Sequence, residues 1–267
     1  RGLGDVYKRQ GAASGIGLTT ALRLAELGHY VYIGVHLENQ VESCLEKIRS
    51  YGLEERISVQ VLDITDPKSR HQIFDLDIDC LINNAAIGVG GALLDLSVDA
   101  IRYNFEVNVF STIELIQLYA ASLFLKKKKG KVVIISSLAG VVPIPFMSSY
   151  SATKASLISF ATALRKEVKL LDIDITVKLI EPGIYYTGFN EVMIDNQEKY
   201  LKPEAIFSSI YPEIRRKQRF FFHLFGKTNL DSIERKIVTA SLSDSAKFIY
   251  RAPLFQGIVA KLYALFK

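Results

Sequence analysis

Three polar residues between positions 136 and 154 have the types and the spacing needed for proton transfer. Tyr150 and Lys154 are four residues apart, so in a helix they lie on one face, one turn apart. A free tyrosine has a pKa of about 10, and a nearby cation favours the phenolate and lowers that pKa. Ser137 could hold the oxygen of a carbonyl or alcohol group against the phenol. These residues predict general acid–base chemistry on such an oxygen.

The flanking segments are the elements that must position these side chains. Residues 131–135 read Lys-Val-Val-Ile-Ile, which is typical of a buried parallel strand. Apolar residues then recur at helical spacing from 155 to 171. Ser137 therefore follows a strand, and Tyr150 and Lys154 lie in the first turns of a helix. The alternative is a surface Tyr and Lys on an ordinary amphipathic helix, and this pair alone does not decide between the two.

A glycine-rich turn near the start of the chain predicts a phosphate site. Gly11, Gly15 and Gly17 precede a helical pattern at 18–27 that ends at Gly28. Such a turn lets backbone N–H groups and a helix N-terminus approach a pyrophosphate without interference from Cβ atoms. The dinucleotide-binding pattern also requires a strand directly before the glycines.

Residues 1–10 lack the apolar pattern of that strand. They match a reading frame through the transposon adapter used to prepare sequencing libraries, so we interpret them as an adapter-derived segment outside the native fold. The first strand is then either missing or replaced by these residues. The alternatives are a genuine polar N-terminal arm, or a truncated and inactive fragment that does not fold stably. Val6 to Arg9 would fit the slot poorly, because Lys8 and Arg9 would flank a buried position.

Beyond the glycines, short apolar runs alternate with helical patterns. We expect strands at 29–35, 56–62, 79–82 and 174–180, and helices at 38–51 and 98–125, with Asp66 and Pro67 opening a short helix. Strands that alternate with helices predict an α/β fold of the Rossmann type, a doubly wound parallel sheet in three layers. Residues 11–267 form one domain by this interpretation.

Composition excludes several classes of function. The chain has 49% hydrophobic residues and a net charge of +5, of which the first ten residues contribute +2, too little to indicate nucleic-acid binding. The sequence contains no run of eighteen apolar residues, so we expect no transmembrane helix. Cys44 and Cys80 lack metal-ligand spacing and fit a reducing, cytoplasmic location. His29, His71 and His223 have no ligand-like partners, so no metal site is predicted.

Six motifs in order are similar to those of classical short-chain dehydrogenases/reductases. They are Gly-Ala-Ala-Ser-Gly-Ile-Gly at 11–17, Asp63, Asn-Asn-Ala-Ala at 83–86, Asn108, Ser-Ser at 136–137 with Tyr-Ser-Ala-Thr-Lys at 150–154, and Pro-Gly-x-x-x-Thr at 182–187. The resemblance covers roughly residues 11–190. It implies that Tyr150 is the general acid/base, that Lys154 lowers its pKa and holds the nicotinamide ribose, and that Ser137 orients the substrate oxygen. Asn108 would fix a helix kink and a water in a proton relay.

The same resemblance implies a set of cofactor-binding residues and an oligomer. Homodimers or homotetramers are usual in the family, built on the long helices near 98–125 and 150–171. Two departures are Ala86, where the family has Gly, and Gln10, where it has Thr. Besides Tyr150 and Lys154, the expected cofactor-binding residues are Gly11, Ser14, Gly15, Ile16, Gly17, His36, Asp63, Ile64, Asn84, Ala85, Pro182, Gly183 and Thr187.

The choice between NADP and NAD depends on the end of the second expected strand. NAD-dependent enzymes usually carry an acidic residue there for the ribose 2′-hydroxyl. Here Val35 and His36 precede the first carboxylate, Glu38, which favours NADP with His36 facing the 2′-phosphate. NAD stays the alternative, because Ser14 replaces the basic residue that many NADP-dependent relatives carry.

Residues 189–230 are aromatic and basic, and two interpretations are open. They form either a helical lid over an apolar pocket, with peripheral contact to a membrane, or an amphipathic helix packed on the domain with its cations in water, which we favour. The apolar segment 250–267 is expected to cover the sheet edge, a subunit contact or the core. Overall the sequence predicts an oxidoreductase that moves hydride between NADP and an apolar carbonyl/alcohol substrate. The alternative is a non-catalytic dinucleotide-binding protein.

Overall fold

A computed structural model of the chain describes residues 2–4, 15–171, 174–202 and 204–266. Its centre is a seven-stranded sheet in the order β3-β2-β1-β4-β5-β6-β7, with every neighbouring pair parallel. The expected doubly wound sheet is confirmed. The strands are β1 (Gly2–Gly4), β2 (Val31–Val35), β3 (Ile57–Val61), β4 (Cys80–Asn83), β5 (Gly130–Ile135), β6 (Ile175–Pro182) and β7 (Ile249–Ala252).

The central slot of the sheet is occupied by β1. Gly2 pairs with Val31 of β2 on one side and with Cys80 of β4 on the other. Residues from the first ten therefore occupy the position of the first strand, and their interpretation as an adapter-derived segment stays a prediction. The expectation about Val6 to Arg9 lies outside the described residues, and the domain boundary at Gly11 stays a prediction.

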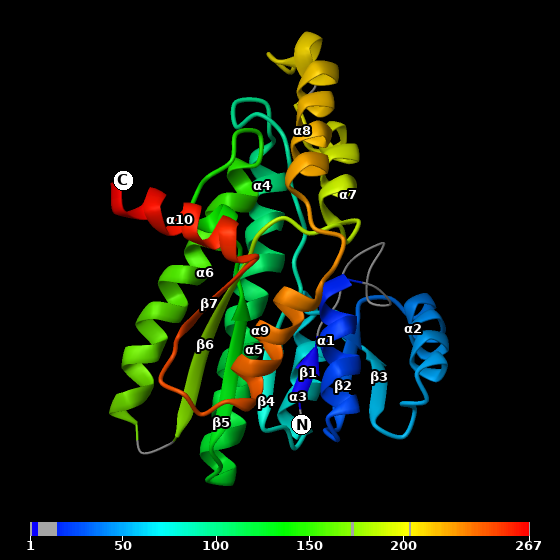
Figure 1. The fold of residues 1–267 in the computed structure, drawn as a ribbon, viewed down its shortest axis with the longest axis vertical. Helices are drawn as coiled ribbons and strands as arrows, with labels where there is room; N and C mark the ends of the chain where they lie inside the picture. The colour runs from blue at the N-terminus through cyan, green and yellow to red at the C-terminus, as the bar shows by residue number, and fades with distance from the viewer. Residues whose placement is uncertain (1, 5–14, 172–173, 203, 267) are drawn as a thin grey trace.

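Helices cover both faces of the sheet (Figure 1). On one face α1 (Gly15–Glu26), α2 (Asn39–Ser50) and α9 (Asp231–Leu242) share an apolar core with the strands, including Cys44 and Ile237. On the other face α5 (Ser111–Lys126) and α6 (Ser148–Glu167) pack through Leu115, Tyr119 and Leu157, beside α3 (Pro67–Asp75). Three layers result, because each helix buries one apolar stripe against the sheet.

The expected helix at 98–125 is a composite. It consists of α4 (Val98–Phe105), a five-residue π-helical segment η1 (Glu106–Phe110) and α5. Ser97 caps its start by accepting a hydrogen bond from Ala100 N, and Lys127 ends it with a left-handed backbone at φ 51°. Residues 98–126 are long and apolar enough to cross a membrane by length and composition, but 56% of the apolar 18-residue stretch within them is buried inside the protein.

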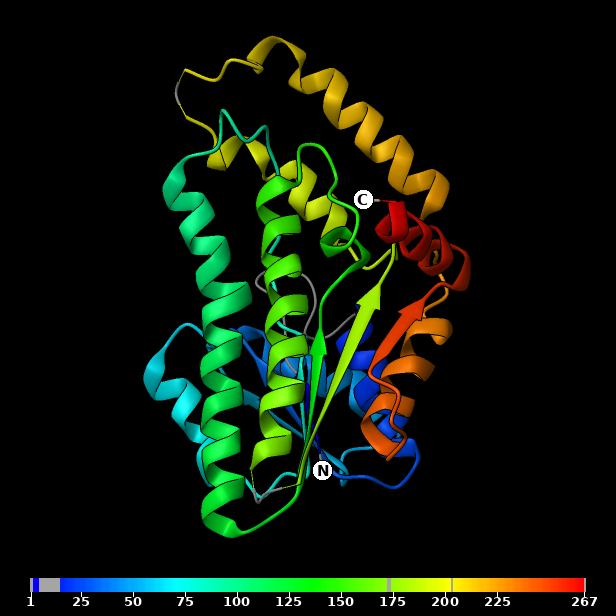
Figure 2. The same cartoon turned by 90° about the vertical axis from the view of Figure 1, so that its left-hand side faces the viewer.

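The remaining segments gather at the end of the molecule toward which the strands point (Figures 1 and 2). They are the short helix η2 (Leu138–Gly140), α7 (Phe189–Asp195), η4 (Gln197–Tyr200), η5 (Ser208–Ile210), α8 (Tyr211–Phe225) and α10 (Leu254–Phe266), while η3 (Val168–Leu170) ends α6 at the opposite end. The segment 250–267 begins inside β7, which is itself the edge strand beside β6 and which the sequence did not predict. The apolar helix α10 is instead largely exposed, so the expectation that it is core is wrong.

Candidate active site

Ser137 is positioned by the end of β5. Its extended backbone (φ −165°) begins η2, where its Oγ accepts a hydrogen bond from Ala139 N at 3.1 Å. The same hydroxyl donates to Pro182 O at 3.4 Å, at the end of the neighbouring strand β6. Two adjacent strand ends therefore hold one hydroxyl, as the strand-end position in the sequence predicts.

Tyr150 and Lys154 lie in the first turns of α6, and both side chains are buried. The Lys154 ammonium donates to Ile135 O, the last carbonyl of β5, at 2.9 Å, and lies 5.7 Å from the centre of the Tyr150 ring. The predicted placement on one helix face is thus present. The alternative of an exposed Tyr–Lys pair does not agree with this burial.

Gly140 allows α6 to approach this strand end. A Cβ atom at Gly140 would lie 2.7 Å from the carbonyl carbon of Lys154 and 2.8 Å from Ala155 N, both backbone atoms that cannot move aside. Ser136 Oγ donates to Lys154 O at 2.7 Å and closes the same contact. We did not single out Gly140 in the sequence, although it stands three residues after Ser137.

The pKa values in this site differ from the expectation that Lys154 lowers the pKa of Tyr150. Burial raises the pKa of the Tyr150 phenol, and a hydrogen bond with Ser137 opposes that rise only in part. Burial also lowers the pKa of Lys154 to about 7, so a smaller fraction of this amine carries a positive charge at neutral pH. The amine donates its hydrogen bond to Ile135 O rather than to the phenol. Loss of water around both groups outweighs their mutual interaction.

Asn108 lies in η1 and is fully buried. Its Oδ1 accepts from Ile87 N at 2.7 Å, and its Nδ2 donates to Ile87 O at 2.9 Å and to Thr153 Oγ1 at 3.1 Å. The carboxamide group of Asn104 lies 2.9 Å from Asn108 Nδ2 and 2.8 Å from Ser149 Oγ. The irregular helix expected at Asn108 is present, and the side chain joins the loop after β4 to the first turns of α6.

A cavity of about 610 Å³ opens at the carboxyl ends of the strands. Ser137, Tyr150 and Lys154 line it together with the N-terminus of α1. That helix begins at Gly15 with φ +82°, and its first turn carries no acidic residue. A helix N-terminus beside a buried amine suits an anionic, hydroxyl-rich ligand. The residues present therefore fit a dinucleotide.

The structure brings most of the expected cofactor residues to this cavity. Ile184 and Tyr185 line it as well, although the sequence did not single them out. Ala85 and Ile64 are buried and are not among the lining residues, and Gly11 and Ser14 lie outside the described part of the chain. The expected residues that line the cavity are Gly15, Ile16, Gly17, Asn84, Pro182, Gly183 and Thr187.

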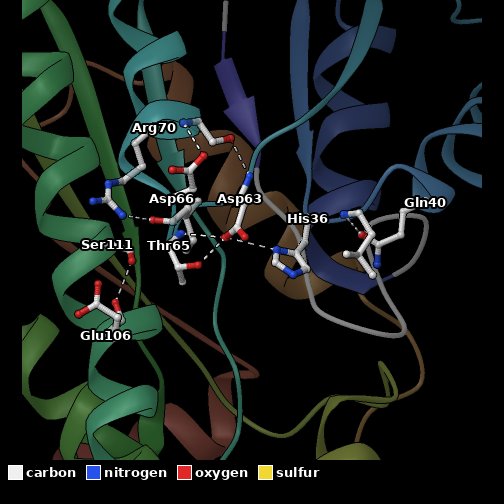
Figure 3. A network of polar contacts seen from close by, with 11 residues as sticks. His36, Gln40, Asp63, Thr65, Asp66, Arg70, Glu106 and Ser111 are labelled. Carbon is white, nitrogen blue, oxygen red and sulfur yellow. Dashed lines mark hydrogen bonds and ion pairs between the residues drawn. The ribbon is translucent and has the colours of Figure 1, made fainter.

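His36 and Asp63 lie together at the ends of β2 and β3, outside that lining. Their side chains point toward one another, with His36 Nδ1 3.4 Å from Asp63 Oδ1 (Figure 3). Asp63 Oδ1 also accepts from Thr65 N at 2.9 Å and from Thr65 Oγ1 at 2.7 Å. The buried Arg70 completes this corner by donating to Ile64 O at 2.5 Å. The sequence pattern gave no signal for Arg70.

Two further polar residues hold the segments above the cavity. Asp95 is buried and accepts from Ile206 N at 2.8 Å and Phe207 N at 2.9 Å, and the Tyr211 hydroxyl donates to it at 3.2 Å. Gln256 of α10 lines the cavity; it accepts from Ile184 N at 2.8 Å and donates to Phe225 O at 2.8 Å. Neither stands in a recognisable motif, so sequence reasoning missed both.

The helical region 189–230 is packed only in part. Tyr211, Ile214 and Phe222 of α8 are buried, but Phe220 and Leu224 are 65% and 60% exposed. The favoured interpretation, an amphipathic helix with its apolar face packed on the domain, therefore describes the face of α8 that carries Tyr211, Ile214 and Phe222. It does not describe the exposed aromatic and leucine side chains of the last turns. Cys44 and Cys80 are free and buried, and the described residues contain no cluster that could hold a metal ion.

Comparisons with known proteins identify the family. The sequence profile described as short chain dehydrogenase matches residues 10–198. A Helicobacter pylori protein, probable short-chain type dehydrogenase/reductase VdlC, is 30% identical over 264 residues, which cover 96% of this chain and 90% of that protein. A 3-ketodihydrosphingosine reductase from Bacteroides thetaiotaomicron is 32% identical over 188 residues, covering 68% of this chain and 64% of that protein.

A solved structure shows the same fold. The crystal structure of a short chain dehydrogenase/reductase from Burkholderia phymatum in complex with NAD has a TM-score of 0.81 and 20% identity, covering 98% of this chain and 91% of that chain. The profile match extends over most of the length of the chain, and it includes every position from Asp63 to Thr187 that the motifs marked. The chain therefore belongs to the short-chain dehydrogenase/reductase family of oxidoreductases.

Proposed function

We propose that this protein is an NADP-dependent oxidoreductase that transfers hydride between the nicotinamide and a carbonyl/alcohol carbon of an apolar small molecule. The observation that carries the proposal is the convergence of Ser137, Tyr150 and Lys154 on one cavity beside the N-terminus of α1. A proton donor, a hydroxyl that can hold a substrate oxygen, and an amine that can exchange protons then face the same space.

In the reducing direction Tyr150 gives its phenolic proton to the substrate oxygen while Ser137 donates a hydrogen bond to that oxygen. The bound NADP supplies the hydride and its ribose hydroxyls. Burial keeps Tyr150 protonated at neutral pH, as a general acid requires. Lys154, with a pKa of about 7, can restore the proton after transfer. Gly15, Gly17, Asn84 and Thr187 would hold the nucleotide.

Asn108 acts by positioning in this proposal. Its carboxamide is engaged by Ile87 and Thr153, and Thr153 Oγ1 in turn donates to Tyr150 O at 2.7 Å. These bonds hold the first turns of α6 against the loop after β4. The relay water that the family resemblance implies at Asn108 stays a prediction.

The preference for NADP rests on the residues that follow β2. No carboxylate follows Val35 until Glu38, and the imidazole of His36, which lies beside Asp63, offers an N–H donor for a 2′-phosphate. The Burkholderia phymatum structure contains NAD, so the preference must come from this chain's own residues. Thermal stabilisation by NADP and by NAD measures it. We expect the larger shift with NADP, and a smaller NADP shift in His36→Ala. A larger shift with NAD would contradict the preference.

The apolar substrate class rests on the walls of the cavity. Val142, Ile144, Met147, Met193 and Phe222 line it together with the polar groups, and all but Val142 belong to or pack against the apolar cluster that contains Tyr150. A cavity with apolar walls and a few convergent polar groups favours a largely apolar ligand. The cytoplasmic location and the homodimer or homotetramer stay predictions, and size-exclusion chromatography tests the second.

Tyr150→Phe tests the reaction. Without the phenolic proton, turnover should fall by about a thousandfold or more, while NADP still raises the melting temperature. Tyr119→Phe is the control, since Tyr119 is also buried but lies outside the cavity lining, and it should keep its activity. Retained turnover in Tyr150→Phe would contradict the proposal. Both should also be made in a version with an apolar strand in place of residues 1–10, which tests whether the first strand limits folding.

A further inference from the structure

The C-terminal helix α10 makes little contact with the rest of the described chain. Gly257 and Ala260 are buried and Gln256 is half-buried, whereas Phe255, Leu265 and Phe266 are 72%, 70% and 88% exposed. Every residue from 261 to 266 is exposed, and Lys261 is the one charged residue between 254 and 266. The large apolar side chains of α10 therefore lie on the side that faces away from the domain, where they are in contact with water unless another apolar surface covers them.

The aromatic end of α8 continues this surface. Phe220, Phe221, Leu224 and Phe225 are 40–65% exposed, and Phe225 O is bonded to Gln256 of α10. Figure 2 shows the end of α8 beside α10, at the end of the molecule where the strands point. We call the exposed apolar side chains of 220–225 and 254–266 the apolar rim. Patches of this kind mark interaction sites.

The cavity opens within the apolar rim. Phe221, Phe225, Phe255 and Val259 line the cavity and are also 40% or more exposed. An apolar molecule could therefore pass from an apolar phase into the cavity without crossing a polar border.

The charges beside the apolar rim are mainly positive. Segments 211–227 and 254–266 contain six basic side chains and one acidic side chain, Glu213. Three of the six form ion pairs, Arg215 with Glu198, Lys217 with Glu213 and Arg219 with Asp195, while Arg216, Lys227 and Lys261 are exposed. Such a distribution attracts an anionic surface.

We propose that the apolar rim docks on an anionic phospholipid bilayer, with α10 lying in the interface and the cavity opening toward the lipid. The thirteen residues of α10 span about 20 Å, less than the roughly 30 Å of a hydrocarbon core, which suits a helix lying in the plane of the membrane. The net charge of +5 favours an anionic lipid surface over a second, equally basic copy of the chain as the occupant of this face. Docking itself does not depend on the proposed reaction; only delivery of substrate does.

The lack of tryptophan in this chain provides a direct test. Tyr263→Trp places a single fluorophore in α10, and Phe124→Trp places one at an exposed position of α5, on another surface. With phosphatidylcholine–phosphatidylserine vesicles, we expect the emission of Tyr263→Trp to shift to shorter wavelength and to be quenched by brominated lipid. Phe124→Trp should show neither change.

Vesicle sedimentation measures the affinity. Leu262→Asp with Leu265→Asp should weaken binding by about a hundredfold, because two leucine side chains no longer enter the lipid. The matched control is Leu170→Asp with Leu171→Asp, two exposed leucines beyond the end of α6, and it should bind like the wild type. Arg216→Gln with Lys227→Gln should lower binding to phosphatidylserine vesicles and leave the weak binding to pure phosphatidylcholine unchanged.

Several outcomes would overturn the proposal. The first is that the wild type does not bind vesicles. The second is that the two double leucine variants, at 262 and 265 and at 170 and 171, bind vesicles with equal affinity. Another is that Leu262→Asp with Leu265→Asp converts a dimer to a monomer in size-exclusion chromatography while the wild type does not bind vesicles, which would assign the face to a second copy. Because none of these measurements uses turnover, failure of the proposed reaction and failure of docking remain separate results.

Discussion

The two walls of the cavity are held in different ways. The catalytic wall, formed by Ser137, Tyr150, Lys154 and Asn108, is fixed by buried hydrogen bonds to backbone groups such as Ile135 O and Ile87 N. The outer wall, formed by α7, η4, α8 and α10, depends on a few bonds between distant segments. Asp95 bonds Ile206 and Phe207 more than a hundred residues away, and Gln256 bonds Phe225.

This difference indicates separate tasks. The catalytic wall must hold atoms at fixed distances, since small misplacements reduce rate strongly. The outer wall must admit substrate, and its aromatic end and α10 are exposed. We therefore expect substitutions in the catalytic wall to reduce stability and kcat together. Substitutions in the outer wall should mainly change KM and the local protection of backbone amides from hydrogen exchange.

Among substitutions that separate the two walls, the largest effect on stability is expected for Asn108→Ala. It leaves the N–H and C=O of Ile87 without their partner and releases Thr153. We expect a loss of about 3 kcal/mol in the free energy of unfolding and about a hundredfold in kcat. Denaturant unfolding and steady-state kinetics measure these. The outer-wall counterpart Asn190→Ala, with one 3.4 Å bond to Tyr185 O, should cost under about 0.5 kcal/mol. Equal losses of unfolding free energy in the two variants would contradict the proposed difference between the two walls.

Lys154 should make the stability of the catalytic wall depend on pH. Its folded pKa of about 7 is below its ordinary value of 10.5, so the unfolded chain binds more protons between these values. Stability should therefore rise with pH in that window, by up to about 1.4 kcal/mol per pH unit. Lys154→Met should lack the rise, as compared by denaturant unfolding at several pH values. A parallel rise in the variant would assign it to other groups.

Asp95→Asn tests the anchor of the outer wall. The amide loses a charged acceptor for the N–H groups of Ile206 and Phe207. We expect a loss of about 1.5 kcal/mol in stability, faster hydrogen exchange at residues 204–211, and little change in kcat. Asp99→Asn, at an exposed carboxylate on the neighbouring helix α4, is the control. Unchanged exchange at 204–211 would contradict the anchoring role.

The smallest effect is expected for Gln256→Ala. Its loss frees the end of α8 and the N–H of Ile184. We expect the free energy of unfolding to fall by about 1 kcal/mol. The KM for an apolar substrate should rise several-fold, with kcat nearly unchanged. Gln72→Ala on the surface of α3 provides the baseline. A large fall in kcat with unchanged KM would place Gln256 in the catalytic wall instead.

Sequence reasoning was most successful for the catalytic wall. The i, i+4 spacing of Tyr150 and Lys154, and the position of Ser137 after a strand, depend only on local helix and strand geometry. Their convergence follows from the parallel sheet, whose strand ends meet at one edge. The direction of the pKa shift at Tyr150 was not predictable, because it depends on burial by segments far away in the sequence.

The outer wall was not predictable for the same reason. Asp95 and Gln256 stand in no motif, and their partners lie far away along the chain. The apolar pattern of 254–266 predicted a helix but not its exposure, since a buried and an interfacial helix have similar composition. β7 was likewise defined only by pairing with β6.

The sequence by itself determined the parallel α/β fold, the polar residues that meet at the strand ends, and the helix that carries Tyr150 and Lys154. These features follow from short-range periodicity and from the geometry of parallel strands. The tertiary structure decided which groups lose water, which distant side chains anchor the outer wall, and that α10 lies exposed beside the cavity. Such properties depend on packing between segments that are far apart along the chain, which no local pattern encodes.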